Sequence, residues 1–247
     1  MMYSIFCVLP FVVCLLWTIL FALRWHEHND AQRMLLFFAG VCTVLYGCHA
    51  HYLSETNSIY VESLWMMCSL AVYPLFYLYI VLLTDYRRRP TALNLLLLLP
   101  ALLLPAVHLL FPSYPIRTIQ SVVFVLLIVY VCAMGLVRLY RLERDIQNTY
   151  SNTTDKSSRG IQWLLTCFAL TSLFSIIFSA IGRDTFREDL LVAIPSLLFS
   201  TMLFILFYVG DRYSFSARQM QSEECPPLGS EEELPTPVSD EEQAQFA

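Results

Sequence analysis

Seven long apolar runs, separated by short polar patches, constrain this chain more than any other feature of its sequence. Each run is about 20 residues long, the length that a helix needs to cross about 30 Å of hydrocarbon. The runs are continuously apolar and do not alternate, so they are not strands of a membrane barrel, and in lipid only a helix satisfies its own backbone hydrogen bonds. The sequence therefore predicts an all-α membrane protein, a bundle of seven transmembrane helices. The predicted spans are about 3–23, 34–52, 63–84, 93–111, 118–137, 161–181 and 190–210.

The composition excludes a soluble fold of this size. Of the 247 residues, 57% are apolar and only 14% are charged, against about 25% charged in soluble domains. Eight cysteines occur, but nearly all lie in or beside the apolar runs, where we expect them to pack as small apolar groups. No pair has the spacing of a zinc site. No disulfide, metal site or cofactor is predicted.

The basic residues of the links between spans give the bundle an orientation. Twelve of them lie in the first, third and fifth links and in the C-terminal segment, and three lie in the other links. Because Lys and Arg are enriched on the cytoplasmic side, the N-terminus is predicted outside and the C-terminus in the cytoplasm. The fifth link, 138–160, is predicted to be a polar loop. Prolines inside the spans are predicted to kink helices without ending them; they are Pro74, Pro100, Pro105 and Pro195.

The chain changes character after Gly210. Residues 211–247 are predicted to form a cytoplasmic tail, of which 211–221 is a polar juxtamembrane segment. From Ser222 to Ala247 there are eight acidic residues, four prolines and no basic residue. Such a stretch buries too little apolar surface to offset its ordering entropy, so a disordered acidic linker is predicted. Two interpretations stay open: the chain has been cut before a further domain, or the tail is itself a docking segment.

Histidines near the predicted outer ends of spans are candidate ligand-binding residues. No Asp, Glu, Lys or Arg lies well inside a span, which argues against ion-coupled transport. His49 and His51 are two positions apart on one helix, so they point about 200° apart and do not easily share a metal ion. We favour interface residues over a ligand site for His49 and His108. No catalytic motif occurs, so the chain is not predicted to be an enzyme.

The most distinctive interior stretch is 72–80, Val-Tyr-Pro-Leu-Phe-Tyr-Leu-Tyr-Ile. Tyr73, Tyr77 and Ile80 share one helical face beside Pro74. One interpretation is a ligand pocket or hinge formed by Tyr73, Pro74 and Tyr77. The other, which we favour, is that the hydroxyls bond neighbouring helices in the bundle.

Six arginines at the predicted cytoplasmic ends of spans form a basic anchor. Such clusters hold helix ends against anionic lipid, and they also offer a surface that a partner could recognise. The six are Arg87, Arg88, Arg89, Arg138, Arg141 and Arg144.

Several short stretches resemble one bacterial family. They are Pro-Leu-Phe-Tyr-Leu-Tyr-Ile at 74–80, Leu-Thr at 83–84, Leu-Pro-Ala-Leu-Leu at 99–103 after a basic link, and Phe-Tyr-Val-Gly-Asp-Arg-Tyr at 207–213. This layout is similar to that of membrane-bound AraC-type helix-turn-helix regulators, and it covers most of residues 30–247. The family's two helix-turn-helix units are absent from this sequence. The resemblance therefore implies the sensor half, in the bacterial inner membrane, with no direct nucleic-acid binding. A net charge of −5 agrees with that.

The predicted function is a membrane sensor or receptor-like module that relays an extracytoplasmic signal to a cytoplasmic output, namely transcription regulation. The alternative is a small membrane transporter or channel subunit, which an inverted repeat and polar groups at mid-depth would favour. The predicted partners are the lipid bilayer, a cytoplasmic output domain or regulator, and a second copy of the chain.

Overall fold

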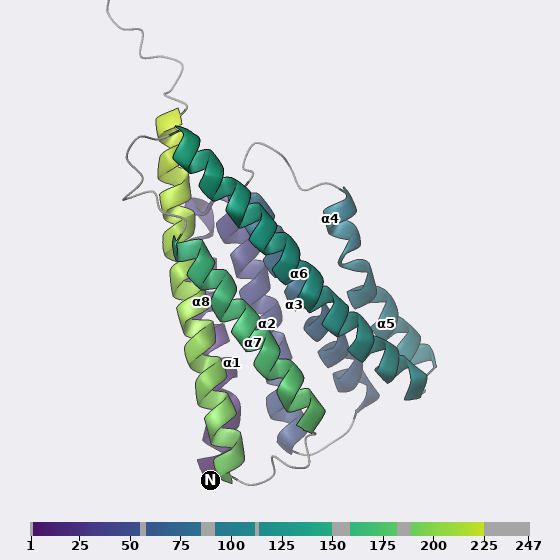
Figure 1. The fold of residues 1–247 in the computed structure, drawn as a ribbon. Coiled ribbons are helices and arrows are strands. Elements are labelled where there is room, and N and C mark those ends of the chain that lie inside the picture. Colours follow the sequence, from purple (N-terminus) through teal and green to yellow (C-terminus); the bar gives the residue numbers. More distant parts are fainter. Residues whose placement is uncertain are drawn as a thin grey trace, which may run out of the picture.

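The computed structural model is all-α, which confirms the all-α part of the predicted fold class. It describes residues 2–54, 58–84, 92–111, 114–149, 159–181 and 189–224. The α-helices are α1 (Met2–Leu23), α2 (Asp30–Ser54), α3 (Ile59–Thr84), α4 (Ala92–Leu96), α5 (Leu99–Leu110), α6 (Tyr114–Thr149), α7 (Arg159–Ile181) and α8 (Asp189–Glu224), and a short 3-10 turn, η1 (Trp25–Glu27), follows α1. The helices lie side by side in one bundle (Figure 1). The N-terminal end of the bundle is the end where α1 begins, and the C-terminal end is the end where α8 stops.

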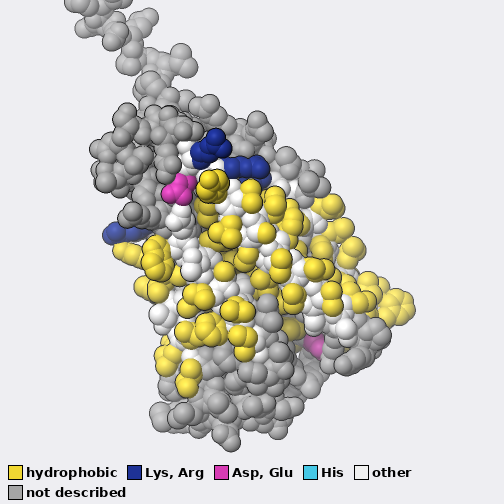
Figure 2. Space-filling view, viewed as in Figure 1, with side chains coloured by type: hydrophobic (Ala, Val, Ile, Leu, Met, Phe, Trp, Pro, Cys, Tyr) yellow, Lys and Arg dark blue, Asp and Glu magenta, His cyan; other side chains and the backbone are white. Residues whose placement is uncertain are grey.

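The apolar helices indicate a multi-pass membrane protein. In the described part of the chain, three helical segments are long and apolar enough to cross a membrane: Asp30–His51, Ile59–Thr84 and Thr118–Arg144. Shorter apolar helical stretches are Val8–Leu23, Asn94–Leu110 and Leu165–Phe174. Apolar side chains also cover much of the visible surface of the bundle, as they do where a surface faces lipid (Figure 2).

Helix α3 is the central helix of the bundle. It packs against α2, α5 and α6, and 78% of its most apolar stretch is buried, against 28% in each of the other two long apolar segments. Phe76 of α3 stacks on Phe168 of α7, with ring centroids 3.8 Å apart. Phe38 of α2 lies 5.5 Å from Phe76 and 5.7 Å from Phe207 of α8, measured between centroids. Aromatic rings from four helices thus form one continuous cluster around α3.

The fourth predicted span is divided into two helices, which corrects one prediction. Helix α4 ends at Leu96 and α5 begins at Leu99, with a turn between them. Pro100 lies in the first turn of α5. Backbone N–H groups in that turn have no acceptor within the helix, so the missing N–H of proline costs no helical hydrogen bond. Pro100 therefore starts a helix, and the prediction that it kinks one was wrong. The other three prolines lie within helices and end none of them: Pro74, Pro105 and Pro195.

Two helices run past the predicted ends of their spans. Helix α6 continues to Thr149, so much of the predicted loop 138–160 is helical. Helix α8 continues to Glu224, so the predicted juxtamembrane segment and the first residues of the predicted linker are helical. Both extensions lack Gly and Pro and are rich in Arg, Gln, Glu and Leu or Met, which favour helix. The rest of the predicted tail, 225–247, lies outside the described residues.

Gly135 lets α6 approach its neighbours closely. A Cβ at this position would lie 3.2 Å from Leu165 Cδ1 of α7 and 3.4 Å from Ile80 Cδ1 of α3. Small residues at helix interfaces commonly permit such contacts in membrane bundles. Gly40 of α2 differs, because a Cβ there would meet nothing within 4 Å.

We expect Gly135→Leu to lower the free energy of unfolding by about 1–3 kcal/mol, since the added side chain has no space between α3 and α7. Gly40→Leu should be neutral or stabilising, because leucine is the better helix former. Thermal unfolding of the two variants in the same detergent measures the difference. Equal effects at the two positions would contradict the close packing at Gly135.

Candidate functional site

Polar side chains of α3 meet polar partners from other helices near both ends of the bundle. We call these groups the N-terminal cluster and the C-terminal cluster. The N-terminal cluster consists of His49, Glu62, Trp65 and His108, and the C-terminal cluster consists of Gln32, Tyr77, Tyr79, Arg138, Gly210 and Asp211. The two clusters contain three of the five predicted ligand-binding residues and one of the predicted anchor arginines.

In the N-terminal cluster, α2 and α3 are joined through His49. The indole Nε1–H of Trp65 donates a hydrogen bond to His49 Nε2 at 3.1 Å, and the two rings meet edge to face. His49 therefore accepts at Nε2, which places the proton of the neutral imidazole on Nδ1. His51 is exposed, so the two histidines lie on different faces of α2, as their spacing predicts.

His108 joins α5 to α3 in the same cluster. Its side chain is only 3% exposed, and its Nε2 lies 3.7 Å from Glu62 Oε2. Neither of its ring nitrogens makes a hydrogen bond within the described part of the chain. A buried polar group without a partner costs about 1–3 kcal/mol, so a polar ligand that bonds a ring nitrogen of His108 would relieve that cost. The structure brings His49 and His108 against different residues of α3, and it does not join them directly.

Between the two clusters, α3 and α6 share one further polar contact. Gln120 Nε2 of α6 donates to Ser69 Oγ of α3 at 3.4 Å, and Ser69 Oγ donates to the carbonyl of Met66 at 2.9 Å. All of these side chains are buried. Polar side chains inside a membrane bundle bond neighbouring helices in this way.

The predicted tyrosine face of α3 lies against α6 and α7. The ring of Tyr73 packs edge to face on Phe124 of α6 and on Phe168 of α7. Tyr77 is 1% exposed, and its hydroxyl accepts a hydrogen bond from Arg138 Nε of α6 at 3.1 Å. These are the contacts of a helix interface. Ligand binding by Tyr73, Pro74 and Tyr77 stays a prediction.

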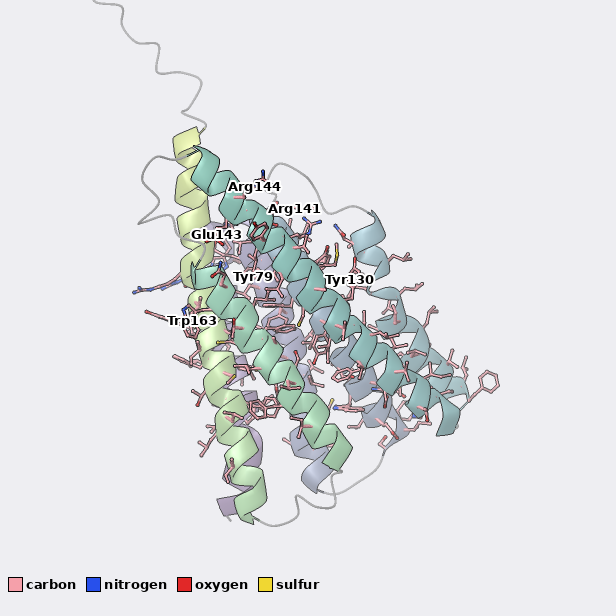
Figure 3. All side chains as sticks on the ribbon, viewed as in Figure 1. Tyr79, Tyr130, Arg141, Glu143, Arg144 and Trp163 are labelled. Carbon is pink, nitrogen blue, oxygen red and sulfur yellow. The ribbon has the colours of Figure 1, made fainter. Side chains whose placement is uncertain are left out.

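Tyr79 is the functional candidate that sequence reasoning missed. It is fully buried, and its hydroxyl donates to the carbonyl oxygen of Gly210 in α8 at 3.0 Å (Figure 3). Beside it, Gln32 Nε2 of α2 donates to Asp211 Oδ1 at 3.4 Å. Two helices thus hold α8 at the point where its polar extension begins. The sequence did contain a signal, namely a tyrosine near the end of an apolar span. A buried tyrosine needs a hydrogen-bond partner for its hydroxyl, so this position could have been identified as a contact between helices.

The described anchor arginines lie together on α6 at the C-terminal end of the bundle. Arg138 contacts Tyr77, whereas Arg141 and Arg144 are exposed (Figure 3). Glu143 accepts a hydrogen bond from Gln162 Nε2 of α7 at 2.7 Å. The basic side chains border the apolar surface at this end (Figure 2). The other predicted anchors, Arg87, Arg88 and Arg89, lie outside the described residues.

The chemistry of these clusters is that of contacts between helices. Within the described ranges, no three His, Cys, Asp or Glu side chains are close enough to share a metal ion. Each cluster joins α3 to at least two other helices through polar groups. A change at one end of α3 therefore has a physical route to the other end.

No protein-family model matches the chain, and no curated protein is significantly similar to it.

Proposed function

We propose that this chain is a membrane sensor module that relays an extracytoplasmic signal to a cytoplasmic output, and that the output is transcription regulation. The observation that carries the proposal is the hydrogen bond from Tyr79 to the Gly210 carbonyl. It joins the central helix to the residue of α8 that immediately precedes its polar extension. The resemblance of 74–80 and 207–213 to AraC-type membrane regulators supports the same arrangement, because this bond joins the two stretches.

In this proposal the chain crosses the bacterial inner membrane seven times. Helices α1, α2, α3, α6, α7 and α8 form one span each, and α4 and α5 together form the fourth. The N-terminal cluster then faces the outside and the C-terminal cluster faces the cytoplasm. Three long apolar segments and the excess of basic residues in alternate links support this topology.

A reporter enzyme fused after Gln221 tests the orientation. Cytoplasmic activity is expected, because the extension of α8 lies inside the cell in this topology. Fusion at the link 112–113, which lies outside the cell in the same topology, serves as the matched control and should give periplasmic activity. The opposite pattern at the two sites would overturn the orientation.

The relay works through α3, which is one continuous helix from Ile59 to Thr84. From Glu62 to Tyr79 the helix rises about 26 Å, which spans most of the hydrocarbon thickness. A signal that alters the contacts of His49 or His108 shifts α3, and the shift moves the Gly210 carbonyl. Such a signal must bind two arrangements of the bundle with different affinity. The partner at the cytoplasmic side is an output domain or a separate regulator docked on the α8 extension.

Allele replacement in the native host tests the proposed output. Cells carrying Tyr79→Phe should change the same set of transcripts as cells lacking the gene, because the variant disconnects α8 from α3. The control is Tyr60→Phe, an exposed tyrosine at the start of the same helix, which should leave those transcripts unchanged. A deletion that alters no transcripts would contradict the proposal.

A further inference from the structure

Arg138 is held in a fixed position at the edge of the apolar surface. It lies on α6, and its Nε–H donates to the Tyr77 hydroxyl at 3.1 Å. Its guanidinium carbon lies 5.6 Å from the centroid of the Tyr77 ring. Tyr130 supports Tyr77 from α6, with ring centroids 5.8 Å apart. The guanidinium is therefore oriented by the buried side chain of Tyr77.

The positive charge of Arg138 has no carboxylate partner in the described part of the chain. The close pairs of basic and acidic side chains found there are Arg33 with Asp30 and His108 with Glu62. Glu143, the acidic residue nearest in sequence among those described, points to α7, where it accepts from Gln162. Because Tyr77 occupies Nε–H, the donors of the two Nη groups remain for another acceptor.

The neighbours of Arg138 on α6 indicate the depth at which it lies. Leu136 and Val137 are large apolar residues exposed on the bundle surface just before it, at 58% and 43%. Arg141 and Arg144 follow Arg138 toward the C-terminal end of α6, and both are exposed. Arg138 thus lies at the boundary between apolar and polar surface, where a bilayer places its phosphate groups.

We propose that Arg138 forms a specific binding site for the phosphate of an anionic glycerophospholipid, and that Tyr77 positions its guanidinium for this contact. The planar fork of Nη1 and Nη2 matches two phosphate oxygens. Arg141 adds a second positive charge one turn away, which favours a headgroup with net negative charge over a zwitterionic one. The site joins a lipid to α3 and α6 through one side chain.

Lipid binding to the full chain, purified in a neutral detergent, tests this site. Native mass spectrometry counts bound phosphatidylglycerol and phosphatidylcholine across a titration. The wild type should bind phosphatidylglycerol more tightly. Arg138→Gln should weaken that binding by about tenfold or more, because a charge-assisted bidentate contact is lost. Arg138→Lys should also lose most of it, since lysine keeps the charge without the fork.

Two matched variants separate this site from general surface charge. Arg144→Gln removes an exposed arginine from the same end of α6, and should change the affinity by less than about twofold. Tyr77→Phe should weaken binding about threefold, because the guanidinium loses the hydroxyl that orients it. Each variant is compared only if its circular dichroism and elution volume match those of the wild type, and Arg138→Lys provides the test if Arg138→Gln does not fold.

Three results would overturn the proposal. The first is equal affinity of the wild type and Arg138→Lys for phosphatidylglycerol. The second is equal affinity of the wild type for the two lipids. The third is displacement of the lipid by millimolar inorganic phosphate, which would assign the site to a free anion.

Discussion

Polar groups on the central helix must find partners inside the protein, and the rest of the structure depends on this constraint. Helix α3 is largely buried, and an unpaired polar group in such surroundings is costly. Tyr77, Tyr79 and Ser69 each meet a polar partner on another helix. These bonds and the packed aromatic rings around Phe76 fix which faces of α2, α6, α7 and α8 turn toward α3.

The same constraint connects the two ends of the bundle. At one end, Glu62 and Trp65 bring α3 against histidines of α5 and α2. At the other end, Tyr79 bonds the backbone of α8 just before its polar extension. A helix with polar contacts at both ends can pass a displacement along its length. The proposed sensor function and the proposed lipid site both use contacts of this one helix.

Apolar run length predicted the helices well, because hydrocarbon thickness sets a length that can be read from the sequence. Run length carries no information on where a helix stops in water, so the extensions to Thr149 and Glu224 were missed. The turn before Pro100 was missed because a proline in the first turn of a helix and a proline inside one look alike in a continuous apolar run. The spacing of two residues correctly predicted that His49 and His51 lie on different faces of one helix. It could not identify Tyr79, whose role depends on a carbonyl of a helix far along the chain.

The proposed relay depends most directly on the hydrogen bond between the Tyr79 hydroxyl and the Gly210 carbonyl. Hydrogen exchange of the backbone amides of 211–224, measured on the full chain in lipid nanodiscs, tests it. Loss of a bond worth about 1 kcal/mol should raise their exchange about fivefold in Tyr79→Phe. The exposed Tyr60 provides the control, and Tyr60→Phe should leave the exchange unchanged. Equal exchange in Tyr79→Phe and the wild type would show that α3 does not hold the extension of α8, and would contradict the proposed relay.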